Sequence, residues 1–131
     1  MKKPYILCVD DDKSILISLK AQLQHYLGAN YHYELAESAA EAWEVINELN
    51  ENGDSISVIF SDYIMPLVKG DEFLISVHQK YPDIVKIMLT GHADGDAVLH
   101  TKEQANLAAV FGKPWDISEI LACIKNALSE Q

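Results

Sequence analysis

Short apolar runs alternate along the chain with longer segments whose apolar residues have helical spacing. The apolar runs span about residues 5–9, 32–36, 57–61, 84–89 and 107–111, which is the usual length of a β-strand. The fourth run is nearly continuous in apolar residues, which is typical of a strand covered on both faces. Five strand–helix pairs with short connections predict an α/β fold, with one parallel sheet and helices on both of its faces.

Signals at the ends of the helical segments support this division. Gly28 ends the first helix, and Ser38 with Glu41 and Asp116 with Glu119 have the spacing of capping boxes. The fourth helix is expected at about 94–105. The others are expected around the following apolar sets: Ile15, Leu16, Leu19, Leu23 and Leu27; Ala42, Val45, Ile46 and Leu49; Phe73, Leu74, Val77 and Tyr81; Ile117, Ile120, Leu121, Ile124 and Leu128.

Polar residues follow four of the five predicted strands, at the point where each strand ends. These residues are Asp10, Asp62, Thr90 and, after one glycine, Lys113. The carboxyl ends of parallel strands share one edge of a sheet, where ligands bind at the switch in strand order. The sequence therefore predicts one pocket with several carboxylates, a hydroxyl and an ammonium group, suited to a divalent cation and a phosphoryl group.

The carboxylates of the first and third strands are expected to lie closest together. In the common strand order 2-1-3-4-5, the strand before Asp10 and Asp11 neighbours the strand before Asp62. Carboxylates this close repel one another, and a cation such as Mg²⁺ relieves the repulsion. An alternative remains open, in which residues 10–12 form a solvated turn and Asp12 caps the first helix.

Asp62, Lys113 and Thr90 have complementary chemistry for phosphoryl transfer. A carboxylate at Asp62 can attack phosphorus and become an acyl phosphate, while Lys113 supplies a positive charge and Thr90 a hydrogen-bond donor. Each residue alone is also an ordinary strand-end or loop residue. Only the ordered set, with one member at each strand end, favours the functional interpretation.

The bulk properties limit the class of protein. The chain has 131 residues, which we expect to form a single domain over residues 1–131. Its net charge is −10 and its ten basic residues are all lysines, so direct nucleic-acid binding is not expected. No apolar run has the length of a membrane span and no signal-peptide pattern is present. Cys8 and Cys123 lack metal-ligand spacing and suggest a reducing, cytoplasmic location.

At these motifs the sequence resembles the receiver domains of two-component response regulators. The resemblance covers essentially the whole chain. The matching segments are Ile6-Leu7-Cys8-Val9-Asp10-Asp11-Asp12, Ser61-Asp62-Tyr63-Ile64-Met65-Pro66 with Gly70, Thr90-Gly91, and Lys113-Pro114-Trp115.

The resemblance implies a role for each matching residue. Asp62 is similar to the phosphoacceptor, Thr90 to the switch hydroxyl and Lys113 to the lysine of the family. Asp11, Asp62 and the backbone carbonyl of Ile64 resemble the ligands of Mg²⁺ or Mn²⁺, and Asp10 resembles the carboxylate that lies beside the ion without binding it directly.

The resemblance also implies a fold, partners and an output. The fold would be flavodoxin-like, a (βα)5 doubly wound sheet of order 2-1-3-4-5. The phosphodonor would be a sensor histidine kinase or a histidine phosphotransfer protein. Output to an attached domain, an effector protein or a second copy of the chain would pass through the fourth helix, fifth strand and last helix. The domain would be a signalling phosphoacceptor that catalyses only its own phosphorylation and dephosphorylation.

Two positions depart from the family pattern. The aromatic residue usual three positions before the lysine is Val110 here, and Phe111 lies one place later, on the opposite face of a strand. The loop after Pro66 reads Leu67-Val68-Lys69, which is more apolar than usual.

Three other classes of protein share part of this pattern. A haloacid-dehalogenase-type phosphatase would use the Asp-x-Asp pattern of residues 10–12, but it would leave Asp62 without a role. A flavodoxin would need a phosphate-binding loop rich in Ser, Thr and Gly after the first strand, and that loop is missing. A receiver that binds partners without being phosphorylated would not need the complete set of key residues.

Overall fold

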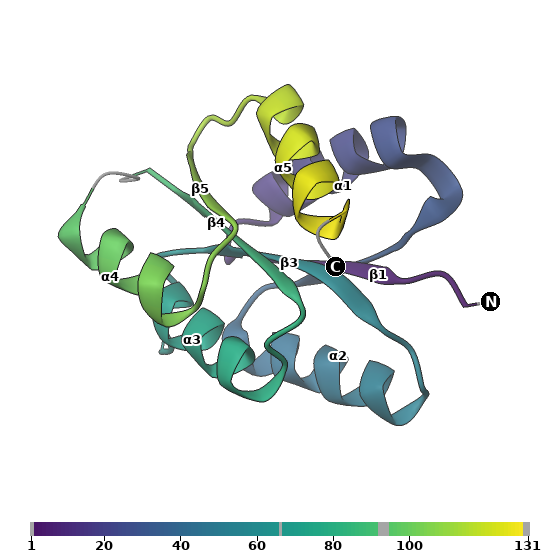
Figure 1. Ribbon diagram of the computed structural model, residues 1–131, viewed down its shortest axis with the longest axis horizontal. Coiled ribbons are helices and arrows are strands. Elements are labelled where there is room, and N and C mark those ends of the chain that lie inside the picture. The colour runs from purple at the N-terminus through teal and green to yellow at the C-terminus, as the bar shows by residue number, and fades with distance from the viewer. Residues whose placement is uncertain (1, 66, 92–94, 130–131) are drawn as a thin grey trace.

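The computed structural model describes residues 2–65, 67–91 and 95–129. Pro66 of the Met-Pro motif and residue 94, where the fourth helix was expected to begin, lie outside these ranges. Five parallel strands form one sheet in the order β2-β1-β3-β4-β5. In Figure 1, α1 and α5 cover one face of the sheet, and α2, α3 and α4 cover the other. The predicted flavodoxin-like fold and strand order are confirmed.

Strands and helices alternate along the whole chain, as the sequence predicts. Their bounds are β1 Tyr5–Val9, α1 Lys13–Leu27, a 3-10 turn Gly28–Asn30, β2 His32–Ala36, α2 Ala39–Glu51, β3 Ile56–Asp62, α3 Gly70–Lys80, β4 Val85–Thr90, α4 Asp96–Gln104, β5 Ala109–Gly112 and α5 Ile117–Ser129.

Two apolar layers fill the space between the sheet and its helices. One contains Leu16, Leu19 and Leu23 of α1 with Ile120 and Ile124 of α5, packed on the sheet residues Ile6, Cys8, Val58, Phe60, Val85, Ile87 and Leu89. The other packs α2, α3 and α4 against the opposite face, around Ile46, Phe73, Leu74, Val77 and Val98. The central strands are buried on both sides, which explains their nearly continuous apolar sequence.

The fifth strand begins two residues later than expected, at Ala109. The apolar Leu107 belongs instead to the end of α4, where its amide donates to the carbonyl of Lys102 at 3.0 Å. Asn106 has a left-handed φ of 50°, and its amide donates to Glu103 at 3.4 Å. These two bonds form a Schellman motif, in which Asn is the favoured replacement for Gly. Leu107 is thus a buried helix-end residue that looks like part of the strand in the sequence.

A lysine lies inside β4, where the sequence pattern predicts only apolar contacts. Lys86 is 1% exposed, and its Nζ donates to the carbonyls of Ile84 at 2.7 Å and Pro82 at 3.3 Å. Burial lowers the pKa of Lys86, and nearby Asp83 partly opposes this effect. Its side chain is long enough for the ammonium group to bind backbone carbonyls of the turn between α3 and β4, while its methylene groups pack in the interior.

Candidate functional site

The register of the central strands places the candidate residues at one edge of the sheet. Val9 pairs with Ser61, so Asp10 lies beside Asp62 at the ends of β1 and β3. Thr90, the last residue of β4, pairs with Gly112 of β5. The amide of Lys113 donates to the Thr90 carbonyl at 3.0 Å. Residues from four strands therefore meet at this edge, as the sequence predicts.

Lys113 bridges two carboxylates that come from different strands. Its Nζ lies 2.8 Å from Oδ2 of Asp10 and 3.1 Å from Oδ1 of Asp62. The Lys113 side chain is 21% exposed, that of Asp62 13% and that of Asp10 4%. The sequence predicts that Lys113 approaches Asp62, but it gives no sign that the shorter contact is to Asp10.

The three aspartates after β1 have three different environments. Asp10 uses both oxygens: Oδ1 accepts from the amide of Asp12 at 2.9 Å, and Oδ2 accepts from Lys113. Asp12 caps α1 by accepting from the amide of Ser14 at 2.9 Å and from its hydroxyl at 2.6 Å. Asp11 is exposed, and the hydrogen bonds recorded among the described residues do not include its carboxylate. Capping by Asp12 therefore leaves Asp10 and Asp11 available for the role that the sequence predicts.

Carboxylate oxygens of Asp10, Asp11 and Asp62 all lie within 4.8 Å of one another. Hard divalent cations such as Mg²⁺ prefer oxygen ligands of this kind. Because both oxygens of Asp10 are already engaged, the carboxylates of Asp11 and Asp62 are the ones best able to reach an ion directly. The donor set therefore fits a divalent cation.

The pKa values of Asp62 and Lys113 are both raised, which disfavours the charged form of the acid and favours the charged form of the base. Burial raises the pKa of Asp62, and repulsion from Asp10 adds to this, while the hydrogen bond from Lys113 works against it. For Lys113, burial alone would lower the pKa, but the hydrogen bonds to Asp10 and Asp62 outweigh burial and raise it. Lys113 thus stays protonated beside a carboxylate whose charge is only partly compensated.

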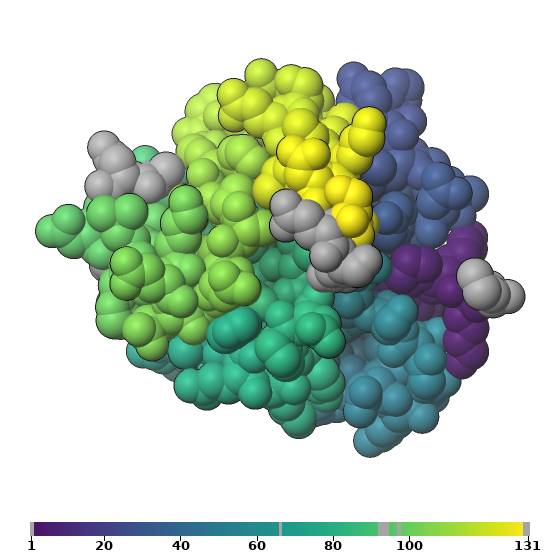
Figure 2. All heavy atoms as spheres, in the orientation of Figure 1, coloured from purple at the N-terminus to yellow at the C-terminus, as the bar shows by residue number. Residues whose placement is uncertain are grey.

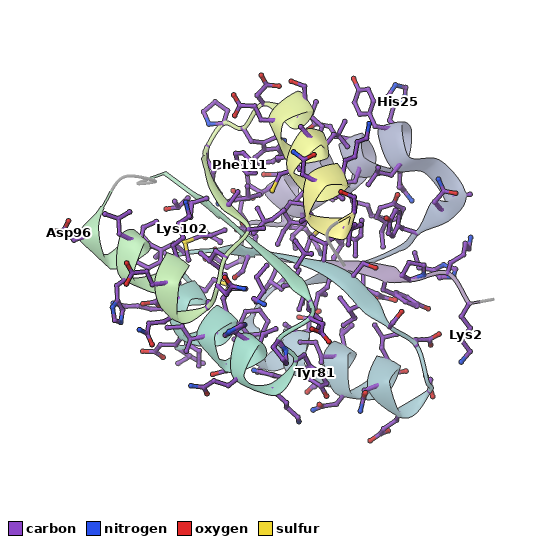
Figure 3. The ribbon with its side chains drawn as sticks, viewed as in Figure 1. Lys2, His25, Tyr81, Asp96, Lys102 and Phe111 are labelled. Atoms are coloured by element: carbon purple, nitrogen blue, oxygen red, sulfur yellow. The ribbon has the colours of Figure 1, made fainter. Side chains whose placement is uncertain are left out.

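The remaining candidates lie around this ion pair. Thr90 is 1% exposed at the end of β4. Ile64 lies two residues beyond Asp62, with its side chain 61% exposed. Val110 and Phe111 pack into the two different apolar layers, and Figure 3 shows Phe111 on the side of β5 that faces α5. The sequence-based prediction that these two residues point to opposite faces is confirmed.

A hydrogen bond between Trp115 and Gln22 at the edge of the site is not predicted by the sequence. The indole Nε1 of Trp115 donates to Oε1 of Gln22 at 2.7 Å, which ties the segment after Lys113 to α1. A groove of about 460 Å³ lies between α1 and this segment. It is lined by Ile15, Ser18, Gln22, Lys113, Pro114 and Trp115. A Gln far from every motif gives no signal of this contact in the sequence.

Comparison with known proteins identifies the family. The family model for the response regulator receiver domain matches residues 6–125. The chain belongs to the response regulator receiver domain family. The crystallised signal receiver domain of an HD domain-containing protein from Pseudomonas fluorescens superposes with a TM-score of 0.85 at 26% identity, covering 98% of this chain and 97% of that one. The beryllofluoride-activated NtrC4 receiver domain dimer gives 0.81 at 32% identity, covering 96% and 97%.

This receiver domain is also similar to segments of longer proteins. It is 30% identical over 129 residues to the DNA-binding transcriptional regulator NtrC of Escherichia coli K12, covering 98% of this chain and 26% of NtrC. The chain spans about a quarter of the length of the first curated relatives that it matches. Among its described residues, no helix is both long and apolar enough to cross a membrane.

Proposed function

We propose that the domain accepts a phosphoryl group on Asp62 from a phosphohistidine donor, a sensor histidine kinase or a histidine phosphotransfer protein. The observation that carries this proposal is the contact of Lys113 with Asp10 at 2.8 Å and with Asp62 at 3.1 Å. Because the ammonium group of Lys113 is shared with Asp10, it compensates the negative charge of Asp62 only in part. The test is incubation with acetyl phosphate and Mg²⁺, after which the intact mass of the wild type should show one added phosphoryl group.

The reaction is a substitution at phosphorus. An Asp62 oxygen forms a bond to phosphorus while the bond from phosphorus to the histidine nitrogen breaks, and the leaving imidazole keeps that electron pair. The products are an acyl phosphate on Asp62 and a free histidine on the donor. Lys113 would attract the phosphoryl oxygens, and Thr90 would supply a hydroxyl from the end of the neighbouring strand. Within this chain, the same residues would then govern hydrolysis of the acyl phosphate.

Mg²⁺ or Mn²⁺ would be held by the Asp11 and Asp62 carboxylates and the Ile64 carbonyl. Asp10 would lie beside the ion without binding it directly, because its oxygens accept from Lys113 and from the Asp12 amide. When bound, the ion neutralises charge that develops on the transferring oxygens. Asp10 keeps Lys113 in place beside Asp62 and, through the amide of Asp12, fixes the start of α1.

We expect Mg²⁺ to raise the melting temperature of the wild type, because the ion binds the native carboxylate cluster and not the unfolded chain. Asp11→Ala should lose most of this shift, and it should slightly raise stability without metal, because it removes one repelling charge. Glu119→Ala, at an exposed carboxylate of α5, is the matched control and should keep the wild-type response. A wild type that shows no shift at saturating Mg²⁺ contradicts the metal assignment.

We propose that output passes through α4, β5 and α5, which form the continuous green-to-yellow part of the surface in Figure 2. Their partner would be an attached output domain, an effector protein or, on phosphorylation, a second copy of the chain. The similar NtrC4 structure, described as a beryllofluoride-activated dimer, supports the last form. The net charge of −10 and the lack of arginine argue against nucleic acid as a direct partner.

The switch should work without an aromatic residue at Val110. Phosphorylation would draw the Thr90 hydroxyl inward, and the backbone between Gly91 and Gly95 would carry this movement to α4. Residues 92–94 of this segment lie outside the described part of the chain. Amide hydrogen exchange with and without beryllofluoride should therefore change at residues 90–105 and stay constant in α2. Changes confined to Phe111 and Trp115 would mean that Phe111 has taken the aromatic role.

We further propose that residues 1–131 form one domain and that it works in the cytoplasm. The two cysteines are free and inside the fold: Cys8 is buried and Cys123 is half-buried. This arrangement suits a reducing compartment. Burial raises the pKa of the Cys8 thiol to about 12, so Cys8 stays protonated and unreactive.

A further inference from the structure

The first residue of α3 lies directly against the backbone of Asp62. Gly70 is buried, and its amide donates to the Tyr63 carbonyl at 2.8 Å. A Cβ atom added at Gly70 would overlap the carbonyl oxygen of Asp62, and it would lie 2.8 Å from the carbonyl carbon of Asp62 and 3.0 Å from Cα of Tyr63. Glycine is therefore required here by lack of space, since its φ lies outside the left-handed region.

The loop between Asp62 and α3 has little support at its tip. Ile64 is 61% exposed, Val68 is 38% exposed and Leu67 is fully exposed. Leu67 also has a left-handed φ of 69°, which is unfavourable for a side chain of this type. The base of the loop is well held, because Met65 is buried in the apolar layer of α2, α3 and α4 and the Gly70 amide closes the loop onto Tyr63. The close approach at Gly70 thus fixes the part of the loop that follows Asp62.

We infer that Gly70 is a positioning residue for phosphoryl transfer. By letting α3 begin against the Asp62 peptide, it fixes the Asp62 carboxylate relative to Lys113 and the Ile64 carbonyl relative to Asp62. This inference rests on the proposed function. It adds a residue that touches neither the phosphoryl group nor the metal.

A methyl group at position 70 cannot fit unless the backbone around it moves. The atoms it would meet are backbone atoms of Asp62, which ends β3 and pairs with Leu89 of β4, and of the next residue, Tyr63. Backbone atoms cannot rotate away like the end of a flexible side chain. Either the Asp62 peptide or the start of α3 has to move. A displacement of about 1 Å in a group that reacts or binds can lower a rate by about 10²-fold.

The test compares Gly70→Ala with the same substitution at another glycine on the same sheet edge. Gly112→Ala is the control, because a Cβ there would meet only the Thr90 carbonyl oxygen, at 4.0 Å. Mg²⁺ affinity by calorimetry and the rate of phosphorylation by acetyl phosphate should both fall in Gly70→Ala, the rate by about 10²-fold. Both should stay at wild-type values in Gly112→Ala. A folded Gly70→Ala protein with wild-type Mg²⁺ affinity and rate overturns the inference.

A measurement on the wild type covers the case in which Gly70→Ala does not fold. The first amides of a helix usually lack a partner within the helix, yet the Gly70 amide should exchange with solvent as slowly as the amides of β3. Exchange as fast as that of Val68 and Lys69 would overturn the inference. If the wild type takes up no phosphoryl group, the proposed function fails, while Mg²⁺ affinity and Gly70 exchange still decide whether the loop is held as inferred.

Discussion

Replacing Asp62 by Asn should abolish phosphorylation by acetyl phosphate. The amide has nearly the shape of the carboxylate, so the fold is kept, but it lacks the anionic oxygen that forms the bond to phosphorus. Intact mass spectrometry after incubation with acetyl phosphate and Mg²⁺ should show one added phosphoryl group in the wild type and none in Asp62→Asn. Asp12→Asn is the matched control, because Asp12 caps α1 and should not be needed for transfer. Uptake by Asp62→Asn at the wild-type rate would contradict this prediction.

The same substitution should stabilise the metal-free protein at neutral pH. The pKa of Asp62 is raised in the folded state, first by burial and then by repulsion from Asp10. A raised acid pKa means that folding disfavours the charged form, so this carboxylate costs stability at pH values above its folded pKa. Asp62→Asn should recover up to about 1 kcal/mol at pH 7, a small value because solvent screens the partly exposed group. In urea titrations, the gain should disappear as the pH falls below about 3.9, where the unfolded carboxyl is also protonated.

Replacing Lys113 by Ala should produce the second large effect. Asp10, with its side chain 4% exposed, and Asp62 would then face each other without the ammonium group that bridges them. Removing one partner of a buried ion pair leaves the other charge uncompensated. We expect a loss of about 2 kcal/mol in the free energy of unfolding, below the range for fully buried pairs because Lys113 retains some contact with water. Phosphorylation should become slower and its effect on α4 weaker, while Asp62 stays the acceptor.

The pH dependence of this loss follows from the pKa of Lys113, which is raised in the folded protein by its bonds to Asp10 and Asp62. Its stabilising effect is complete below the unfolded lysine pKa of about 10.4 and is lost as the pH rises through the higher folded pKa. On the alkaline side, the stabilities of wild type and Lys113→Ala should therefore converge at strongly alkaline pH and not near neutrality. Lys125→Ala, at an exposed lysine of α5, is the control. A stability difference that vanishes near pH 7 would show that the bridge contributes nothing.

The fold could be predicted because its strand and helix signals are strong and local. Buried parallel strands need continuous apolar runs, and the helices carry clear ends such as Gly28 and Ser38, whose hydroxyl accepts from the Glu41 amide at 3.1 Å. The prediction that the fifth strand includes Leu107 was wrong for a physical reason. A buried position after a helix and a buried position in a strand both favour an apolar residue such as leucine. Only Asn106, in a left-handed conformation, separates the two cases.

The members of the site could be predicted, but their contacts could not. Chain order places Asp10, Asp62, Thr90 and Lys113 at one edge, since strand ends converge in any parallel sheet. The shorter contact of Lys113 with Asp10 depends on the directions of the side chains, which the spacing of residues in the sequence does not reveal. The close approach of Gly70 to Asp62 likewise depends on how α3 meets β3, and the sequence shows only a glycine in a loop.

The most direct test of the proposed function is to locate the phosphoryl group in the wild-type chain. After incubation with acetyl phosphate and Mg²⁺, borohydride reduction converts an acyl phosphate into a stable alcohol, and peptide mass spectrometry then identifies the modified residue. The proposal predicts modification at Asp62 alone. Modification at Asp10 or Asp12 with Asp62 intact, or no modification in a folded protein that binds Mg²⁺, would contradict it.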